Sequence, residues 1–158
     1  MTTPDNGPLL AGTVTEAARR YGDRAAFRLT TNEGTVTVGE LSYRELDRAT
    51  DEVAVGLIAR GVGPGSVLLL SLPSGTDYAV AYLAAAKVGA TTAGANPRLR
   101  ARERRLLVDT VEPDLVLATG ALSEGIPTAQ RVEIVEPCED PGRPLLALRN
   151  NGDVAPIA

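Results

Sequence analysis

With 44% hydrophobic and 23% charged residues, a chain of 158 residues is expected to form one globular domain, and this composition excludes a disordered chain. Sixteen basic against twenty acidic residues give a net charge of −4, which argues against nucleic acid as a partner. The chain has no histidine and one cysteine, Cys138, so a Ser-His-Asp triad and an internal disulfide are excluded and a cytoplasmic location is expected.

The N-terminal region predicts a helix followed by a β-hairpin. Residues 1–10 lack a basic stretch before an apolar run, so no signal peptide is predicted. Thr13-Val14-Thr15-Glu16 has the spacing of a capping box and predicts a helix over Val14–Tyr21, ended by Gly22. Two β-segments, Ala25–Thr30 and Thr35–Val38, flank the turn-forming Asn32-Glu33-Gly34.

A second capping box, Ser42-Tyr43-Arg44-Glu45, opens the next predicted helix, which ends at Gly61. Its apolar residues recur at steps of three and four: Leu46, Ala49, Val53, Leu57 and Ile58. The turn Gly61–Gly65 leads into Val67–Leu72, an apolar run typical of a strand that is buried on both faces of a parallel sheet. The longest unbroken apolar run, Val67–Leu70, is far shorter than the roughly 20 residues of a membrane-spanning helix.

Helices and strands then alternate. The predicted elements are a helix over Tyr78–Val88 before Gly89, a strand over Ala90–Ala93, a helix after Asn96-Pro97 with Leu99, Leu106, Leu107 and Val111 on one face, and strands over Leu115–Ala118 and Val132–Val135. Glu112-Pro113-Asp114 ends the second of these helices. This alternation predicts an α/β fold with a doubly wound, mostly parallel sheet of the flavodoxin or Rossmann type, preceded by a helix and a hairpin. Residues 1–135 are expected to form this α/β unit, and residues 136–158 a Pro-rich connector.

Two segments and their spacing resemble the adenylate-forming, or AMP-binding, superfamily. Leu41-Ser42-Tyr43-Arg44-Glu45-Leu46 is similar to that superfamily's leading motif, and the stretch from Ala84 to Pro97 resembles its helix–Lys-x-Gly-Ala–strand–Asn-Pro element. The resemblance covers about Leu9 to Val135 and implies the N-terminal segment of such an enzyme, an incomplete portion of a larger domain. Asp153-Val154-Ala155-Pro156-Ile157 resembles the strand that leads into the family's phosphate loop, so the chain is expected to stop just before that loop.

Within the superfamily, Asn96-Pro97 is more like acyl-CoA synthetases than peptide-synthetase adenylation domains. The resemblance therefore implies a ligase that activates a carboxylic acid, with a fatty acid preferred, as an acyl-adenylate and transfers it to coenzyme A. ATP, Mg²⁺ and coenzyme A are the implied cofactors of the full-length enzyme, and the segment alone is expected to be inactive. Ser66, Ser74 and Gly94-Ala95 depart from the family pattern. The sequence does not determine the chain length of the acid, nor whether coenzyme A or a carrier protein accepts the acyl group.

No catalytic, cofactor-binding or metal-binding residue is assigned from the sequence. The turn Gly61–Ser66 lacks a cation and is interpreted as a plain helix-to-strand turn. Lys87, the chain's one lysine, is interpreted as a helix-dipole contact, and Asn96 as a turn residue. Arg98–Arg105 is interpreted as a solvated helix face, and Tyr78 and Tyr82 as packing residues.

Two alternatives differ in class. The first is a stand-alone, non-catalytic module that binds a partner through this scaffold, and the second is an unrelated flavodoxin-like ligand-binding domain. A sheet edge exposed by truncation would also favour self-association.

Overall fold

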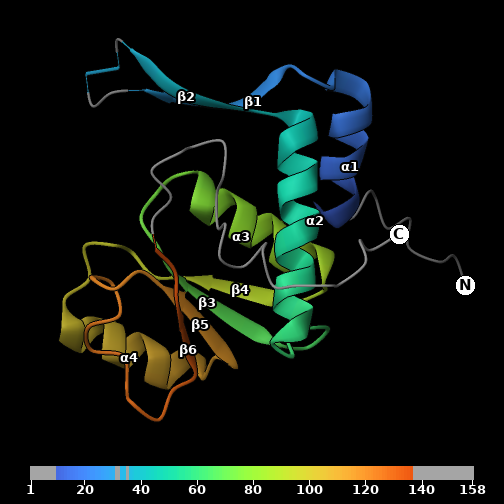
Figure 1. The fold of residues 1–158 in the computed structure, drawn as a ribbon. Coiled ribbons are helices and arrows are strands. Elements are labelled where there is room, and N and C mark those ends of the chain that lie inside the picture. The colour runs from blue at the N-terminus through green and yellow to red at the C-terminus, as the bar shows by residue number, and fades with distance from the viewer. Residues whose placement is uncertain (1–9, 31–32, 35, 137–158) are drawn as a thin grey trace, which may run out of the picture.

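The computed structural model describes residues 10–30, 33–34 and 36–136, so the predicted connector from Pro137 onward, including Cys138, lies outside the described residues. Figure 1 shows a parallel sheet with helices on both sides and a separate hairpin. In chain order the elements are α1 (Leu10–Tyr21), β1 (Ala25–Thr30), β2 (Thr37–Ser42), α2 (Tyr43–Ala59), β3 (Val67–Ser71), α3 (Thr76–Lys87), β4 (Thr91–Gly94), α4 (Ala101–Val111), β5 (Leu115–Ala118) and β6 (Val132–Ile134). Among these residues, no helix has the length and apolar character needed to cross a membrane.

The four later strands form one parallel sheet in the order β4-β3-β5-β6, which confirms the predicted α/β class. In the register of this sheet, Leu68 lies opposite Leu115 and Leu69 opposite Val116. β3 is therefore an inner strand, and its residues 68–71 are all buried. This burial explains the continuous apolar run, because both faces of an inner strand are covered by helices.

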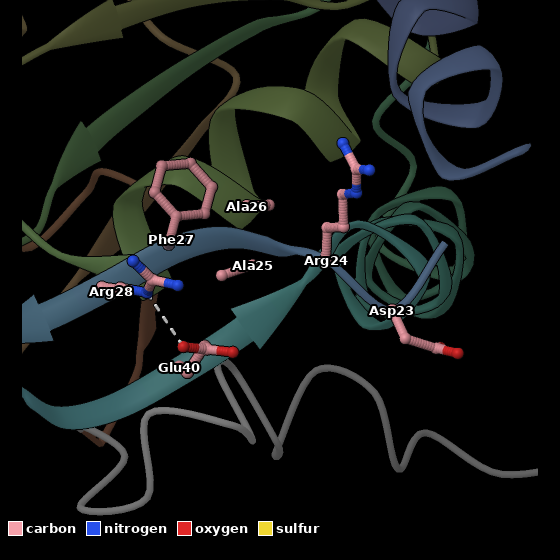
Figure 2. Close-up of a pocket in the computed structure, with 7 residues that line it drawn as sticks. All are labelled: Asp23, Arg24, Ala25, Ala26, Phe27, Arg28 and Glu40. Carbon is pink, nitrogen blue, oxygen red and sulfur yellow. Dashed lines mark hydrogen bonds and ion pairs between the residues drawn. The ribbon is translucent and has the colours of Figure 1, made fainter. Parts of the chain in front are cut away.

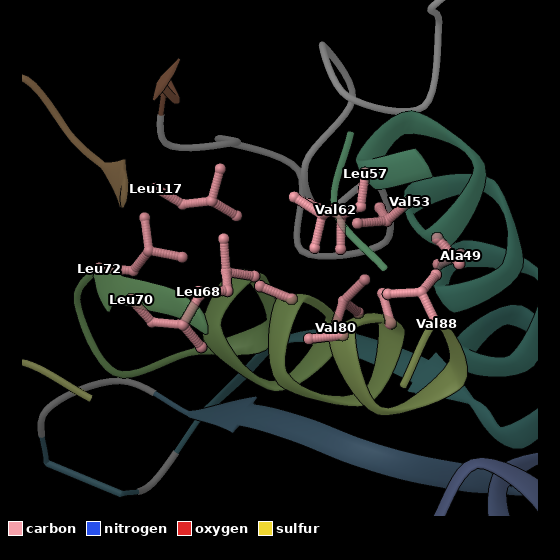
Figure 3. Close-up of a cluster of buried hydrophobic side chains, with 14 of the residues drawn as sticks. Ala49, Val53, Leu57, Val62, Leu68, Leu70, Leu72, Val80, Val88 and Leu117 are labelled. Carbon is pink, nitrogen blue, oxygen red and sulfur yellow. The ribbon is translucent and has the colours of Figure 1, made fainter. Parts of the chain in front are cut away.

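The two faces of the sheet carry separate hydrophobic clusters. On one face Leu68 and Leu70 pack with Val80 of α3 and Leu57 of α2, as Figure 3 shows. On the other face Leu69 and Val116 pack with Val108 of α4. The helices α3 and α4 thus cover opposite faces, as a doubly wound sheet requires.

The hairpin and the long helix form where the sequence predicted them, apart from small shifts of their ends. β1 pairs antiparallel with β2, which begins two residues later than predicted and continues to Ser42. Ser42 caps α2 as expected: its Oγ accepts a hydrogen bond from the amide of Glu45 at 3.2 Å, and the Glu45 carboxylate accepts one from the amide of Ser42 at 2.8 Å. Of the predicted apolar face, Ile58 alone points outward, with 49% of its surface exposed.

The predicted start of the first helix was wrong, and the predicted apolar face of α4 is confirmed only in part. α1 begins at Leu10, so Thr13 lies inside the helix and is not its N-cap residue. Thr15, also in the predicted capping box, donates a hydrogen bond to the Oδ1 atom of Asp47 in α2 at 2.9 Å. Local capping signals are overridden here by packing, because Val14 is buried against the core. Of the predicted apolar face of α4, Leu107 and Val111 pack against the core, but Leu106 is 58% exposed and Leu99 precedes the helix. The fully buried residues of α4 are Arg104 and Val108.

Candidate functional site

The sheet topology locates one edge where a ligand can bind. β3 connects to β4 on one side, and the chain then crosses to β5 on the other side of β3. Neighbouring strands whose connections leave in opposite directions open a crevice at their carboxyl ends, and open α/β sheets bind ligands there. The candidate site is therefore the carboxyl edge around Ser71 of β3 and Ala118 of β5.

Ser71 and Thr119 hold the loops at this edge. The hydroxyl of Ser71 donates to the carbonyl oxygen of Leu122 at 2.8 Å, and the amide of Thr119 donates to the carbonyl oxygen of Ser71 at 3.4 Å. Both side chains are buried. These bonds fix the loop that follows β5 across the end of β3.

The turn before α3 brings a helix N-terminus to the same edge. Gly75 is the N-cap residue and makes no side-chain capping bond, because it has no side chain. The first helical residue, Thr76, is buried, and Asp77 provides an acidic group in the first turn. A carboxylate at this position interacts favourably with the helix dipole, so the turn has a structural explanation.

Tyr78 and Asn96 shape the other side of the edge. The Tyr78 hydroxyl lies so close to Gly94 that a Cβ atom at position 94 would collide with it. The Oδ1 atom of Asn96 accepts a hydrogen bond from the amide of Arg98 at 2.9 Å, the turn contact expected for an Asn before Pro. Tyr78 also packs against the core, whereas Tyr82 is 41% exposed.

The turn Gly61–Ser66 lies before β3, at the opposite edge of the sheet. The amide of Gly63 donates to the Ser66 hydroxyl at 3.0 Å, and the amide of Ser66 donates to the Gly63 carbonyl at 3.0 Å. Both amides thus donate to oxygen atoms within the turn, which agrees with its interpretation as a helix-to-strand connection.

Lys87 links helices α3 and α2 through ion pairs. It lies in the last turn of α3, as predicted, but its Nζ atom lies 2.7 Å from Asp47 Oδ1 and 2.6 Å from Asp51 Oδ1 of α2. The lysine side chain is 9% exposed. Sequence reasoning missed these partners, although two aspartates one turn apart in α2 were a visible signal.

Arg104 is a buried cation, and it corrects the interpretation of Arg98–Arg105 as a solvated face. Its Nη1 atom donates to the Glu124 carbonyl at 2.6 Å and its Nη2 atom to the Leu99 carbonyl at 2.8 Å. Nearby, Gly125 has φ +86°, and a Cβ atom there would collide with the backbone of Ala101. The guanidinium and the glycine together lock the loop after β5 against the start of α4.

Glu133 of β6 is paired with Arg60 at the end of α2. The Arg60 Nη2 atom donates to Glu133 Oε1 at 2.7 Å. This hydrogen bond, opposed by burial and aided by the charges of Arg60 and Arg131, holds the pKa of Glu133 below its ordinary value of 4.5. The pair attaches the edge strand β6 to the helical layer.

Two concave surfaces of the described residues include neither Ser71 nor Thr119 of the carboxyl edge. The larger, of about 660 Å³, runs along β1 and includes Asp23, Arg24 and Phe27, with an Arg28–Glu40 ion pair of 3.0 Å across the hairpin (Figure 2). The smaller, of about 350 Å³, lies at the end of α4 beside Glu112 and Pro113. Within the described ranges, no group of three His, Cys, Asp or Glu residues could hold a metal ion.

The model of the family described as AMP-binding enzyme matches residues 14–153. The chain belongs to this family. The resemblance drawn from the motifs around Tyr43 and Asn96 is thereby confirmed at the level of the superfamily.

Curated relatives of this AMP-binding chain act on several acids. It is 38% identical over 98 residues to a salicyl-AMP ligase / salicyl-S-ArCP synthetase of Mycobacterium tuberculosis, with 62% of this chain and 17% of the relative covered. It is 44% identical over 57 residues to 4-coumarate–CoA ligase 5 of Oryza sativa subsp. japonica, with 36% and 11% covered. The chain thus spans less than a fifth of the length of these relatives.

Solved structures share the fold. A benzoate CoA ligase from Burkholderia xenovorans LB400 superposes with a TM-score of 0.74 at 21% identity, covering 94% of this chain and 29% of that one. A fatty acyl CoA synthetase of Mycobacterium tuberculosis gives a TM-score of 0.67 at 18% identity, covering 80% and 26%.

Proposed function

We propose that this chain contributes the first α/β unit of an acyl-CoA synthetase that activates a carboxylic acid with ATP and transfers the acyl group to a thiol. The observation that carries the proposal is the match of the AMP-binding family model to residues 14–153. The doubly wound sheet supports it, since its carboxyl edge is the kind of place where α/β enzymes bind ligands.

The acid is proposed to be aromatic or fatty. The Asn96-Pro97 pair favours the acyl-CoA synthetase branch, and this resemblance implies a fatty acid. The names of the relatives, however, include salicyl, 4-coumarate and benzoate ligases beside a fatty acyl CoA synthetase. Aromatic and fatty acids should therefore both be assayed as substrates.

The described residues do not complete an ATP site. Binding of a nucleotide polyphosphate by a loop of this kind needs free backbone amides together with a cation such as lysine. The chain's one lysine, Lys87, lies between Asp47 and Asp51, and its ammonium group forms ion pairs with both. We therefore assign ATP, Mg²⁺ and thiol binding to residues beyond those described here.

The experiment is ATP–pyrophosphate exchange with benzoate, salicylate, 4-coumarate, hexanoate and palmitate. The 158-residue chain is expected to show no exchange, and the product of any reading frame continuing past codon 158 is expected to exchange with one class of acid. Robust exchange by the 158-residue chain would contradict the assignment of the chemistry to other residues. A stop codon after Ala158, with a stable fold and no exchange, would favour the non-catalytic binding module instead.

A further inference from the structure

The strongest concentration of charge in the molecule lies at the start of α4. Five arginines fall between positions 98 and 105 in a protein whose net charge is −4. Arg104 is buried, whereas the other four side chains are exposed, and we call these four the arginine patch: Arg98, Arg100, Arg102 and Arg105. Buried Arg104 has a structural role, but the patch requires another explanation.

The arginine patch is largely without ion pairs. Among the described residues, Arg98, Arg100 and Arg102 have no ion-pair partner, and Arg105 approaches Asp109 at 3.8 Å. Three exposed arginines elsewhere each contact a carboxylate at 3.0 Å or less: Arg28 with Glu40, Arg44 with Asp23, and Arg48 with Glu52. Within the part of the chain that the structure describes, the guanidinium groups of Arg98, Arg100 and Arg102 therefore have no carboxylate partner and can contact another molecule.

The position of the patch is unfavourable for the isolated fold. The N-terminal end of a helix carries a partial positive charge and favours acidic side chains. α4 begins at Ala101, with Arg100 as its N-cap residue and Arg102 in the first turn. Glu103 offsets part of this charge, but its carboxylate already accepts a hydrogen bond from the amide of Arg100 at 2.8 Å. Clustered like charges at this end destabilise the helix, and an anionic partner would relieve the repulsion.

Hydrogen bonds hold the backbone of the patch in one conformation. The Leu99 amide donates to the Asn96 carbonyl at 3.0 Å, and the Leu99 carbonyl accepts from buried Arg104 at 2.8 Å. The amide of Arg98 is bonded to the Asn96 side chain. A surface whose backbone is already ordered loses less conformational entropy when it binds.

We propose that the arginine patch is a docking surface for an acidic protein surface. It extends over a turn and the first part of a helix, and neither the concave surface along β1 nor the one at the end of α4 includes any of its residues, so it suits a broad partner better than a small phosphate. Leu106, 58% exposed, adjoins the patch and supplies one apolar contact, which is too little for a helix that inserts into a lipid surface. α4 follows β4, so a docked partner would lie beside the carboxyl edge of the sheet.

The probe is a fluorescent helical peptide with Glu and Asp along one face and a central Leu. Its binding to the 158-residue chain is measured by fluorescence anisotropy. The Arg98→Gln/Arg100→Gln/Arg102→Gln variant is expected to bind about tenfold more weakly, and added salt should weaken wild-type binding. The control variant, Arg28→Gln/Arg44→Gln/Arg48→Gln, has the same change in net charge and is expected to bind like the wild type.

Urea unfolding of both triple variants separates binding from stability. The patch variant should be at least as stable as the wild type, because it removes like charges from the start of α4. If it does not fold, Arg102→Gln alone is used, with an expected loss of about twofold. The proposal would be overturned if the peptide did not bind, or if both triple variants weakened its binding equally. It would also be overturned if pyrophosphate, coenzyme A or phosphatidylglycerol vesicles bound through the patch while the peptide did not.

Discussion

Lys87 offers the most direct test of how the helical layer is held together. Replacing it with Met keeps the aliphatic stem but removes the cation between Asp47 and Asp51. Two carboxylates would then share a site without their partner. The side chains of Lys87, Asp47 and Asp51 are 9%, 20% and 37% exposed, so the site lies between a buried and a surface ion pair.

The expected cost follows from this intermediate burial. Breaking a fully buried pair costs about 3–5 kcal/mol, and an exposed pair is worth about 0–1 kcal/mol. Because Asp51 is partly solvated, we expect Lys87→Met to lower the free energy of unfolding by about 2–3 kcal/mol. With a urea m-value of about 2 kcal/mol/M, the unfolding midpoint should fall by about 1–1.5 M.

Urea unfolding followed by circular dichroism measures this change in four proteins: the wild type, Lys87→Met, Asp47→Asn/Asp51→Asn, and the triple variant. In the double-Asn background the same lysine substitution should cost much less, because no uncompensated carboxylates are left behind. A loss below about 0.5 kcal/mol for Lys87→Met, or an equal loss in both backgrounds, would refute the ion-pair explanation.

Three further predictions concern other parts of the scaffold. Gly125→Ala should destabilise the chain by about 2–4 kcal/mol in urea unfolding, because position 125 has φ +86° and a backbone neighbour; Gly120→Ala, with open space around it, is the near-neutral control. Ser42→Ala should cost about 1 kcal/mol by removing the α2 cap, and a change below a few tenths would mean that packing alone sets the helix start. Since the pKa of Glu133 is lowered by Arg60, its contribution is present above pH 4.5 and is lost as pH falls through the lower, folded-state value. The stability gap between wild type and Glu133→Gln should therefore shrink in acid, and a gap that widens there would contradict the sign.

Much of the architecture was predictable because local patterns and the fold agree. The apolar run of β3 indicated a strand buried on both faces, and the Ser42–Glu45 capping box marked the start of α2 within one residue. Where the predictions failed, a tertiary contact outweighed the local signal. α1 begins before its apparent cap, and the buried residues of α4 include Arg104, a residue whose charge pointed to solvent.

By itself, the sequence determined the α/β class, the order of the elements and the family resemblance, because hydrophobic periodicity, capping residues and motif spacing are local properties of the chain. Only the tertiary structure decided what the cations do. The roles of Lys87 and Arg104 depend on partners far along the chain, Asp47 and the carbonyl of Glu124, whose proximity arises when the helices pack on the sheet. A buried charge requires such partners, and their identity becomes visible only when the fold brings them together.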